Sequence, residues 1–129
     1  MSLNKPNLII VMPDELRQQA VGLDKTDPVI TPNLDAFAAE SLTLTNALSN
    51  CPICSPARAM LLTGKYPISN GVTDNCYSKT TEFGVELNED EITLSDVLHD
   101  AGYSQGYIGK YHLDSPKEED AEFTEGWRG

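Results

Sequence analysis

The chain has 129 residues, of which 40% are hydrophobic and 22% charged, as in ordinary globular proteins. Its net charge is −11, and such acidity argues against a nucleic-acid-binding protein. No apolar run approaches the length of a membrane span, and the first one, Leu8 to Met12, is too short for the core of a signal peptide. We therefore expect neither a nucleic acid nor a membrane as a partner, and the cellular compartment stays open.

The first predicted element is a buried strand over residues 7–12. The sequence NLIIVM is continuously apolar and rich in β-branched side chains, which is typical of strands in parallel sheets. Asp14 and Glu15 follow it directly. Open α/β sheets bind ligands at the carboxyl ends of their strands, so these two carboxylates are candidate site residues.

Two further elements are expected before residue 50. Thr31 and Pro32 predict the start of a helix, with Thr as N-cap and Pro at the first helical position. Its apolar face would contain Leu34, Phe37 and Ala38. The alternating pattern of residues 41–48 indicates a strand, whereas residues 24–30 indicate a loop.

The middle of the chain predicts a short helix followed by a long loop. Ser55 and Pro56 repeat the helix-start signal, and Gly64 is placed to end the helix. We expect its apolar face to consist of Ala57, Met60 and Leu61. Residues 69–91 indicate a loop, and the acidic runs 86–91 and 118–122 indicate solvated segments.

The last predicted elements are a helix and a strand. Thr93 and Asp96 fit a capping box, with Leu94, Val97, Leu98 and Ala101 at helical spacing and Gly102 at the end. Residues 103–108 predict a strand that delivers Lys110 and His112 just past its end. Because strands and helices alternate, the chain predicts an α/β fold with a largely parallel sheet flanked by helices.

Cys54 and Arg58 lie at the start of the predicted helix in the middle of the chain. Backbone N–H groups and the helix dipole favour an anion at that position. Arg58, one turn further, can add a planar cationic fork suited to a tetrahedral oxyanion. On spacing alone, a capped helix with a buried cysteine and a surface arginine explains the pattern equally well.

The segment Cys51 to Pro67, CPICSPARAMLLTGKYP, is similar to the signature of the sulfatase family. The family pattern Cys-x-Pro-x-Arg, followed by Leu-Thr-Gly and a basic residue, is met by residues 54–58 and 62–65. PNLIIVMPDE at 6–15, TPNLD at 31–35 and GKYHL at 109–113 resemble further family segments in the same order, with Tyr111 where the family has Trp. The resemblance implies that residues 1–129 are the N-terminal part of a sulfatase catalytic domain of the alkaline-phosphatase-like superfamily.

The resemblance also implies roles for particular residues. Cys54 would be oxidised to formylglycine by a maturation enzyme, and a sulfuric ester, most reasonably a sulfated sugar or small molecule, would be the substrate. Arg58, Lys110 and His112 would contact the sulfate or the formylglycine. Asp14, Glu15 and the modified Cys54 would be ligands of a divalent cation, expected to be calcium because it prefers oxygen donors.

Part of the family's active site has no counterpart in these residues. The resemblance implies further metal ligands, lysines and histidines far downstream, so we expect the chain to carry about half a site and to end before the sheet is complete. We therefore expect little or no catalysis from the 129 residues alone.

Three alternatives remain open from the sequence: two other reactions, and an inactive fragment with a purely structural or binding role. Phosphonate and phosphodiester hydrolases of the same superfamily can use the same formylglycine on a different ester. Cys51-Pro52-Ile53-Cys54 also resembles a glutaredoxin redox pair at a helix start, where the thiol pKa falls. Against the redox pair, Pro56 falls early in the helix, and the motif comes about forty residues after the first predicted strand.

Overall fold

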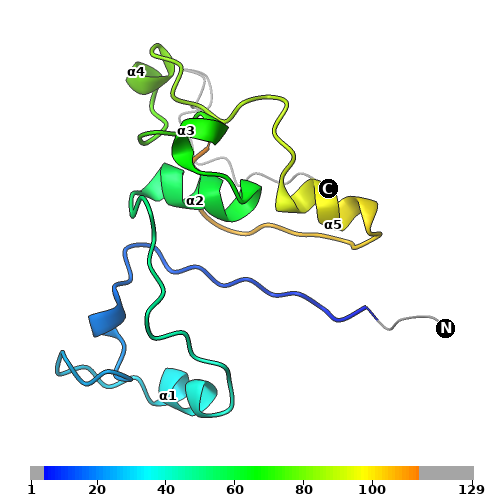
Figure 1. The fold of residues 1–129 in the computed structure, drawn as a ribbon. Helices are drawn as coiled ribbons and strands as arrows, with labels where there is room; N and C mark the ends of the chain where they lie inside the picture. The colour runs from blue at the N-terminus through cyan, green and yellow to red at the C-terminus, as the bar shows by residue number, and fades with distance from the viewer. Residues whose placement is uncertain (1–4, 114–129) are drawn as a thin grey trace. The chain divides into compact units, whose positions relative to one another are not determined.

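The computed structural model describes residues 5–113, which form two compact units divided between Ala47 and Leu48 (Figure 1). The units are described separately. Helices are the regular elements of the described residues: η1 Gln18–Ala20, α1 Pro32–Ala39, α2 Cys54–Thr63, α3 Pro67–Asn70, α4 Ser78–Thr81 and α5 Leu94–Asp100. Over this range no helix is both long enough and apolar enough to cross a membrane. The acidic run at 118–122 lies outside the described residues.

The three predicted strands are not formed in residues 5–113, where the structure contains no strand. Residues 7–12 are extended but unpaired, and a turn at residues 45–46 interrupts the segment 41–48. Residues 103–108 are irregular. A strand is stable only when its N–H and C=O groups are paired with a neighbour, and these segments have no pairing partner among the described residues. Ile9 is accordingly 83% exposed.

In the first unit, the helix predicted after Thr31 is confirmed as α1, but Thr31 does not cap it with its side chain. The Thr31 hydroxyl donates to Asp35 Oδ1 at 2.8 Å and accepts the backbone N–H of Gly22 at 2.8 Å. Thr31 thus ties the preceding loop to the first turn of α1. The predicted apolar face is not buried, since Phe37 is 71% exposed.

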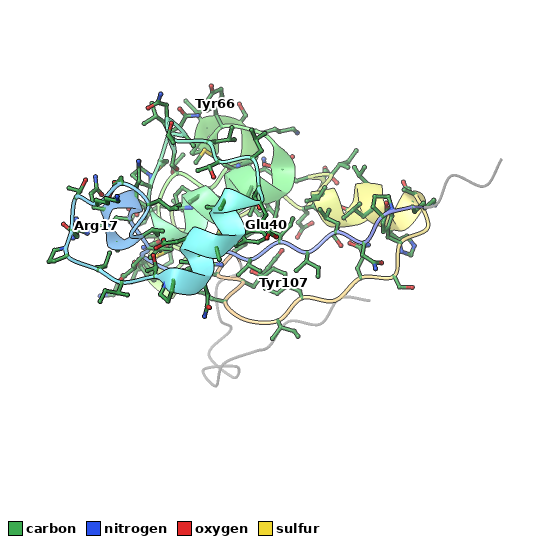
Figure 2. The ribbon with its side chains drawn as sticks, turned by 90° about the horizontal axis from the view of Figure 1, so that it is seen from below. Arg17, Glu40, Tyr66 and Tyr107 are labelled. Carbon is green, nitrogen blue, oxygen red and sulfur yellow. The ribbon has the colours of Figure 1, made fainter. Side chains whose placement is uncertain are left out.

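The loop predicted at 24–30 is also found. The Thr26 N–H donates to Asp24 Oδ1 at 2.9 Å, a short-range bond typical of Asx turns. An ion pair between Arg17, labelled in Figure 2, and Asp27 links the two sides of this part of the chain. Arg17 is well exposed, so this pair contributes little to stability.

The second unit is built around α2, which contacts α3 and α5. Its core consists of Ala59, Val72, Cys76 and Leu113, with Leu62, Leu87 and Tyr111 packed against it. The predicted inward face of α2 is wrong, because Leu61 is 44% exposed, whereas Ser55, Pro56, Arg58 and Ala59 are buried. Two polar residues on the buried face explain the error: hydrophobic periodicity alone cannot identify a face that buries a serine and an arginine.

The ends of α2 and α5 largely follow their local signals. Gly64 ends α2 with a φ of 66°, the left-handed conformation that favours glycine. At α5 the predicted capping box is confirmed, since Thr93 and Asp96 exchange side chain-to-backbone bonds. The Thr93 hydroxyl donates to Asp96 as well, and together these bonds hold the pKa of the Asp96 carboxyl below its ordinary value. Residues 69–91 were predicted to be a loop throughout, but the segment contains the short helix α4 and the last residues of α3.

Gly71 is predicted to be the least replaceable glycine of this unit. Its φ is 87°, and a Cβ placed there would lie 2.6 Å from the backbone oxygen of Glu86. Gly64 also has a positive φ but meets nothing within 4 Å. Gly64→Ala should cost only the left-handed backbone penalty of about 1–2 kcal/mol. Gly71→Ala should lower the free energy of unfolding by more, because the backbone at Glu86 must also move. Urea unfolding of the two variants measures the difference. Equal losses of stability in the two variants would contradict the close approach of Gly71 to the Glu86 carbonyl oxygen.

Candidate active site

The N-terminus of α2 positions the candidate nucleophile. Ile53 is the extended N-cap residue and Cys54 is the first residue of the helix, so α2 begins two positions earlier than the start predicted from Ser55 and Pro56. Cys51 and Cys54 are both free and partly buried. Cys54 therefore lies where the helix dipole favours a bound anion or a negatively charged reacting group.

Ser55 does not cap α2 but joins it to two other segments. Its backbone N–H, one of the first N–H groups of the helix, donates to Asn75 Oδ1 at 2.9 Å. Its hydroxyl donates to the His112 carbonyl oxygen at 2.6 Å and accepts the Cys76 N–H at 3.0 Å. The residue beside Cys54 thus connects the helix to residues 75–76 and to residue 112.

Arg58 is buried, with 6% of its surface exposed, and is not the surface arginine of the alternative interpretation. Its Nη1 donates to the Lys110 carbonyl oxygen at 2.6 Å. The Tyr107 hydroxyl donates to the same oxygen at 2.5 Å, and the Tyr107 ring packs edge-to-face on Tyr111, with centroids 5.8 Å apart. Figure 2 labels Tyr107 on the segment that follows α5. Arg58 therefore holds the backbone that carries Lys110.

These contacts bring four of the predicted site residues into one unit. Cys54 and Arg58 come from α2, and Lys110 and His112 come from the segment bonded to α2 through its carbonyl oxygens. Lys110 and His112 are both half-buried. The Tyr77 ring lies against the His112 imidazole, with centroids 5.9 Å apart. Ser55, Asn75 and Tyr77 were not predicted as site residues, because no local pattern signals a polar contact between distant segments.

Asp14 and Glu15 belong to the first unit, where they form a turn after the extended residues 7–12. Glu15 has a φ of 55°, an uncommon conformation for a residue other than glycine. Carboxylate oxygens suit a hard cation such as calcium. Among residues 5–113, however, no three His, Cys, Asp or Glu side chains gather closely enough to hold a metal ion. These two acids therefore fit as part of a ligand set, not as a complete one.

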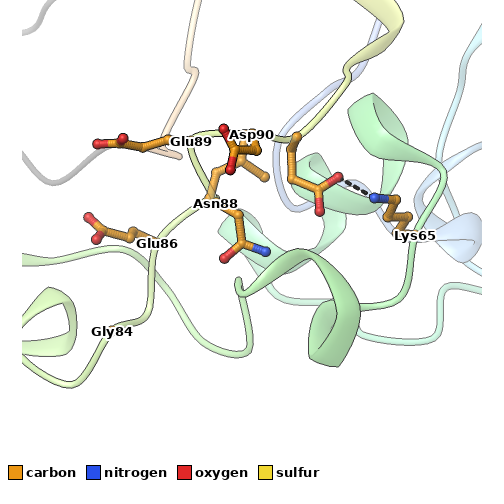
Figure 3. Close-up of a pocket in the computed structure, with 8 residues that line it drawn as sticks. Lys65, Gly84, Glu86, Asn88, Glu89 and Asp90 are labelled. Atoms are coloured by element: carbon orange, nitrogen blue, oxygen red, sulfur yellow. Dashed lines mark ion pairs between the residues drawn. The ribbon is translucent and has the colours of Figure 1, made fainter.

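A hollow of about 650 Å³ in the second unit does not include Cys54, Arg58, Lys110 or His112 (Figure 3). It is lined by Lys65, Gly84, Glu86, Leu87, Asn88, Glu89, Asp90 and Glu91. Four acidic side chains against one lysine make this a poor site for an anionic ester. The surface around α2 and residues 110–112 is the better candidate because its chemistry suits a negative charge.

The ion pair in Figure 3 makes a pH-dependent prediction. Lys65 Nζ lies 2.7 Å from the nearly buried Glu91 Oε2, and its hydrogen bond is the main cause that holds the pKa of Glu91 below its ordinary value of 4.5. A lowered carboxyl pKa stabilises the fold above pH 4.5, and that stabilisation is lost as the pH falls through the folded-state pKa. Lys65→Gln should therefore lower the Tm at pH 7, and the difference should shrink in acid. The matched variant replaces the exposed Lys79 with Gln and should change neither the Tm nor its dependence on pH. A Lys65→Gln effect independent of pH would contradict the assignment.

The family model for sulfatases matches residues 6–127. The chain belongs to the sulfatase family. Its relatives include an endo-4-O-sulfatase of Bacteroides thetaiotaomicron, 48% identical over 91% of this chain and 25% of the relative. An ulvan-active sulfatase of Formosa agariphila is 40% identical over 85% of this chain and 20% of the relative. The sulfatase chain thus spans a quarter or less of the length of these two relatives.

The fold of this sulfatase chain is also found in solved structures. A Bacteroides fragilis protein described as a sulfatase, yidJ, superposes with a TM-score of 0.83 at 51% identity, over 88% of this chain and 24% of that structure. A Bacteroides thetaiotaomicron structure, from a study of glycosaminoglycan metabolism, superposes with a TM-score of 0.77 at 45% identity, over 85% of this chain and 24% of that structure. The backbone of this chain therefore resembles part of these two solved structures.

Proposed function

We propose that this chain supplies the nucleophile side of a sulfuric ester hydrolase site. The observation that carries the proposal is the joining of α2 to residues 110–112. Arg58 and Ser55 bond to the carbonyl oxygens of Lys110 and His112, so a nucleophile at position 54 shares one unit with a cation and an imidazole. Because the chain belongs to the sulfatase family, the reaction proposed for this arrangement is the hydrolysis of a sulfuric ester.

Cys54 is proposed to become formylglycine through a maturation enzyme. A hydrated aldehyde supplies two hydroxyls on one carbon, of which one can attack sulfur and the other can later expel sulfate. The α2 N-terminus favours negative charge at this position through its backbone dipoles. Arg58 is buried one turn further along the same helix, so its guanidinium group favours the same negative charge and positions Lys110 as well.

We propose that Lys110 acts on the sulfate ester and that His112 acts on the proton of the nucleophile's hydroxyl. Lys110 supplies positive charge for the sulfate oxygens, which carry more charge in the transition state. His112 is the candidate to hydrogen-bond the nucleophile's hydroxyl and to accept its proton, because imidazole titrates near neutral pH. Both side chains project from a segment whose backbone is fixed to α2, so both are positioned before a substrate arrives.

Asp14, Glu15 and the modified Cys54 are proposed to contribute ligands to a calcium ion. A bound calcium ion would act as a Lewis acid on the sulfate. Because calcium takes six to eight oxygen ligands, the acids of this chain require ligands from elsewhere in the domain. The same incompleteness leads us to propose that the 129 residues alone turn over little or no substrate, and that the parallel sheet forms only in the whole domain.

A sulfated carbohydrate is the proposed substrate class. The names of two bacterial relatives, an endo-4-O-sulfatase and an ulvan-active sulfatase, support it, although a steryl-sulfatase is also a relative. The test compares matched sulfate and phosphonate esters of 4-nitrophenol on the full-length gene product. The proposal expects faster turnover of the sulfate ester. Preference for the phosphonate would instead support the related phosphonate hydrolases.

A further inference from the structure

His112 has a left-handed backbone conformation, which is uncommon for any residue other than glycine. Its φ is 55°, in the left-handed region where the Cβ of an ordinary residue approaches its own backbone. Such residues persist where their surroundings fix them, and they cluster at functional sites. The question is which contacts of the described residues hold His112 in this conformation.

Ser55 provides the contact to the backbone. Its side chain is fully buried, and its hydroxyl donates to the His112 carbonyl oxygen at 2.6 Å. The Ser55 hydroxyl oxygen accepts the Cys76 N–H at 3.0 Å, so its own proton is directed toward the His112 carbonyl oxygen. A rotation of the His112 backbone would break the Ser55 bond in a place where water cannot replace it.

Asn75 and Tyr77 provide the contact to the ring. Asn75 Oδ1 accepts the Ser55 N–H at 2.9 Å, and its Nδ2 donates to the Tyr77 hydroxyl at 2.7 Å. The Tyr77 ring then lies against the His112 imidazole at a tilt of 55°. A single path of contacts therefore runs from Ser55, beside the nucleophile, through Asn75 and Tyr77 to the imidazole.

We propose that Ser55 is a positioning residue that sets the His112 imidazole relative to position 54, with Asn75 and Tyr77 orienting the ring. This inference rests on the proposed catalytic role of His112. Ser55 does not act on the ester itself; it couples the nucleophile helix to the residue that handles the proton. Because small displacements of a catalytic group have large effects on rate, its loss should reduce kcat rather than substrate binding.

The test compares Ser55→Ala with Ser55→Thr, which keeps the hydroxyl, in the full-length gene product. We expect Ser55→Ala to lower kcat about 10- to 100-fold with KM nearly unchanged, and Ser55→Thr to restore most of the loss. Thr63→Val is the matched control, because it removes a hydroxyl that bonds Ala59 at the other end of α2. It should lower the Tm without this kcat effect. Equal kcat losses in Ser55→Ala and Thr63→Val would overturn the proposal.

A structural measurement keeps this inference separate from the proposed function. In the full-length gene product with selectively labelled histidine, His112 is the NMR reporter and His99, exposed on α5, is an internal reference; the variants His112→Asn and His99→Asn assign their signals. Ser55→Ala should shift the backbone and ring signals of His112 and leave those of His99 in place. Tyr77→Phe, which removes only a hydroxyl, should shift the ring signals alone. If the His112 signals are unchanged in both Ser55→Ala and Tyr77→Phe, the inference is overturned even when the parent enzyme is active. If the signals shift but the unsubstituted full-length protein is inactive, only the proposed function is contradicted.

Discussion

Replacing Cys54 with alanine in the full-length gene product is expected to abolish sulfate-ester hydrolysis. Removing the nucleophile of a covalent mechanism costs on the order of 10⁴-fold or more in kcat, because the remaining groups only bind and polarise the ester. Hydrolysis of 4-nitrophenyl sulfate at saturating substrate measures the effect. Cys54 begins α2 at a partly exposed position, so the substitution should leave the fold intact.

Cys51 is the matched control for this prediction. It is also free and partly buried, and it belongs to the same Cys-Pro-x-Cys segment. Cys51→Ser should retain turnover close to that of the parent, because only position 54 carries the nucleophile. Parent-level turnover by Cys54→Ala would sink the assignment. Equal losses in both variants, with a reversible disulfide in the parent, would instead favour the redox pair.

The second large effect is expected at His112. Asparagine is the best replacement because it tolerates the left-handed backbone better than most residues, so the loss reports the imidazole. We expect His112→Asn to lower kcat about 10²- to 10⁴-fold, the usual contribution of a positioned acid or base. The pH dependence of kcat should also lose the limb that the imidazole controls.

His99→Asn provides the comparison for this second prediction. His99 lies exposed on α5, outside the proposed site, so its replacement should leave both kcat and the pH profile unchanged. If His112→Asn retains turnover within a few-fold of the parent, His112 is not the acid–base residue.

Local signals predicted the start of α5 and the end of α2 correctly, whereas the predicted caps Thr31 and Ser55 do not cap their helices with their side chains. The exchange of bonds between Thr93 and Asp96 involves residues three positions apart, and the left-handed turn at Gly64 depends on that residue alone. Such features are complete within a few residues and need no distant partner. The sulfatase motif was similarly readable, and it identified the family that the family model confirms.

The sheet and the inner face of α2 could not be predicted in the same way. Residues 7–12 have the composition of a buried strand, but a strand needs neighbours, and this chain spans about a quarter of its relatives. The buried face of α2 contains Ser55 and Arg58 because carbonyl oxygens of residues 110 and 112 satisfy them. A periodicity argument counts apolar residues and so assigns such a face to solvent.

Asn75 is an example of a residue of the candidate site that could not be predicted from the sequence. Nothing in its neighbourhood marks it, yet its amide bonds both Ser55 and Tyr77. The predicted residues Arg58, Lys110 and His112 came from motifs. The bonds from Arg58 to Lys110 and from Ser55 to His112 join positions more than fifty apart in the chain. Such pairings depend on how the loops return to α2, which the local sequence does not encode.

Peptide mass spectrometry across position 54 tests the central claim most directly. The protein would be co-expressed with a formylglycine-generating enzyme, and the measurement does not require a complete active site. The account predicts an aldehyde at position 54 and an unmodified thiol at Cys51. An unmodified Cys54 under these conditions would contradict the proposed nucleophile.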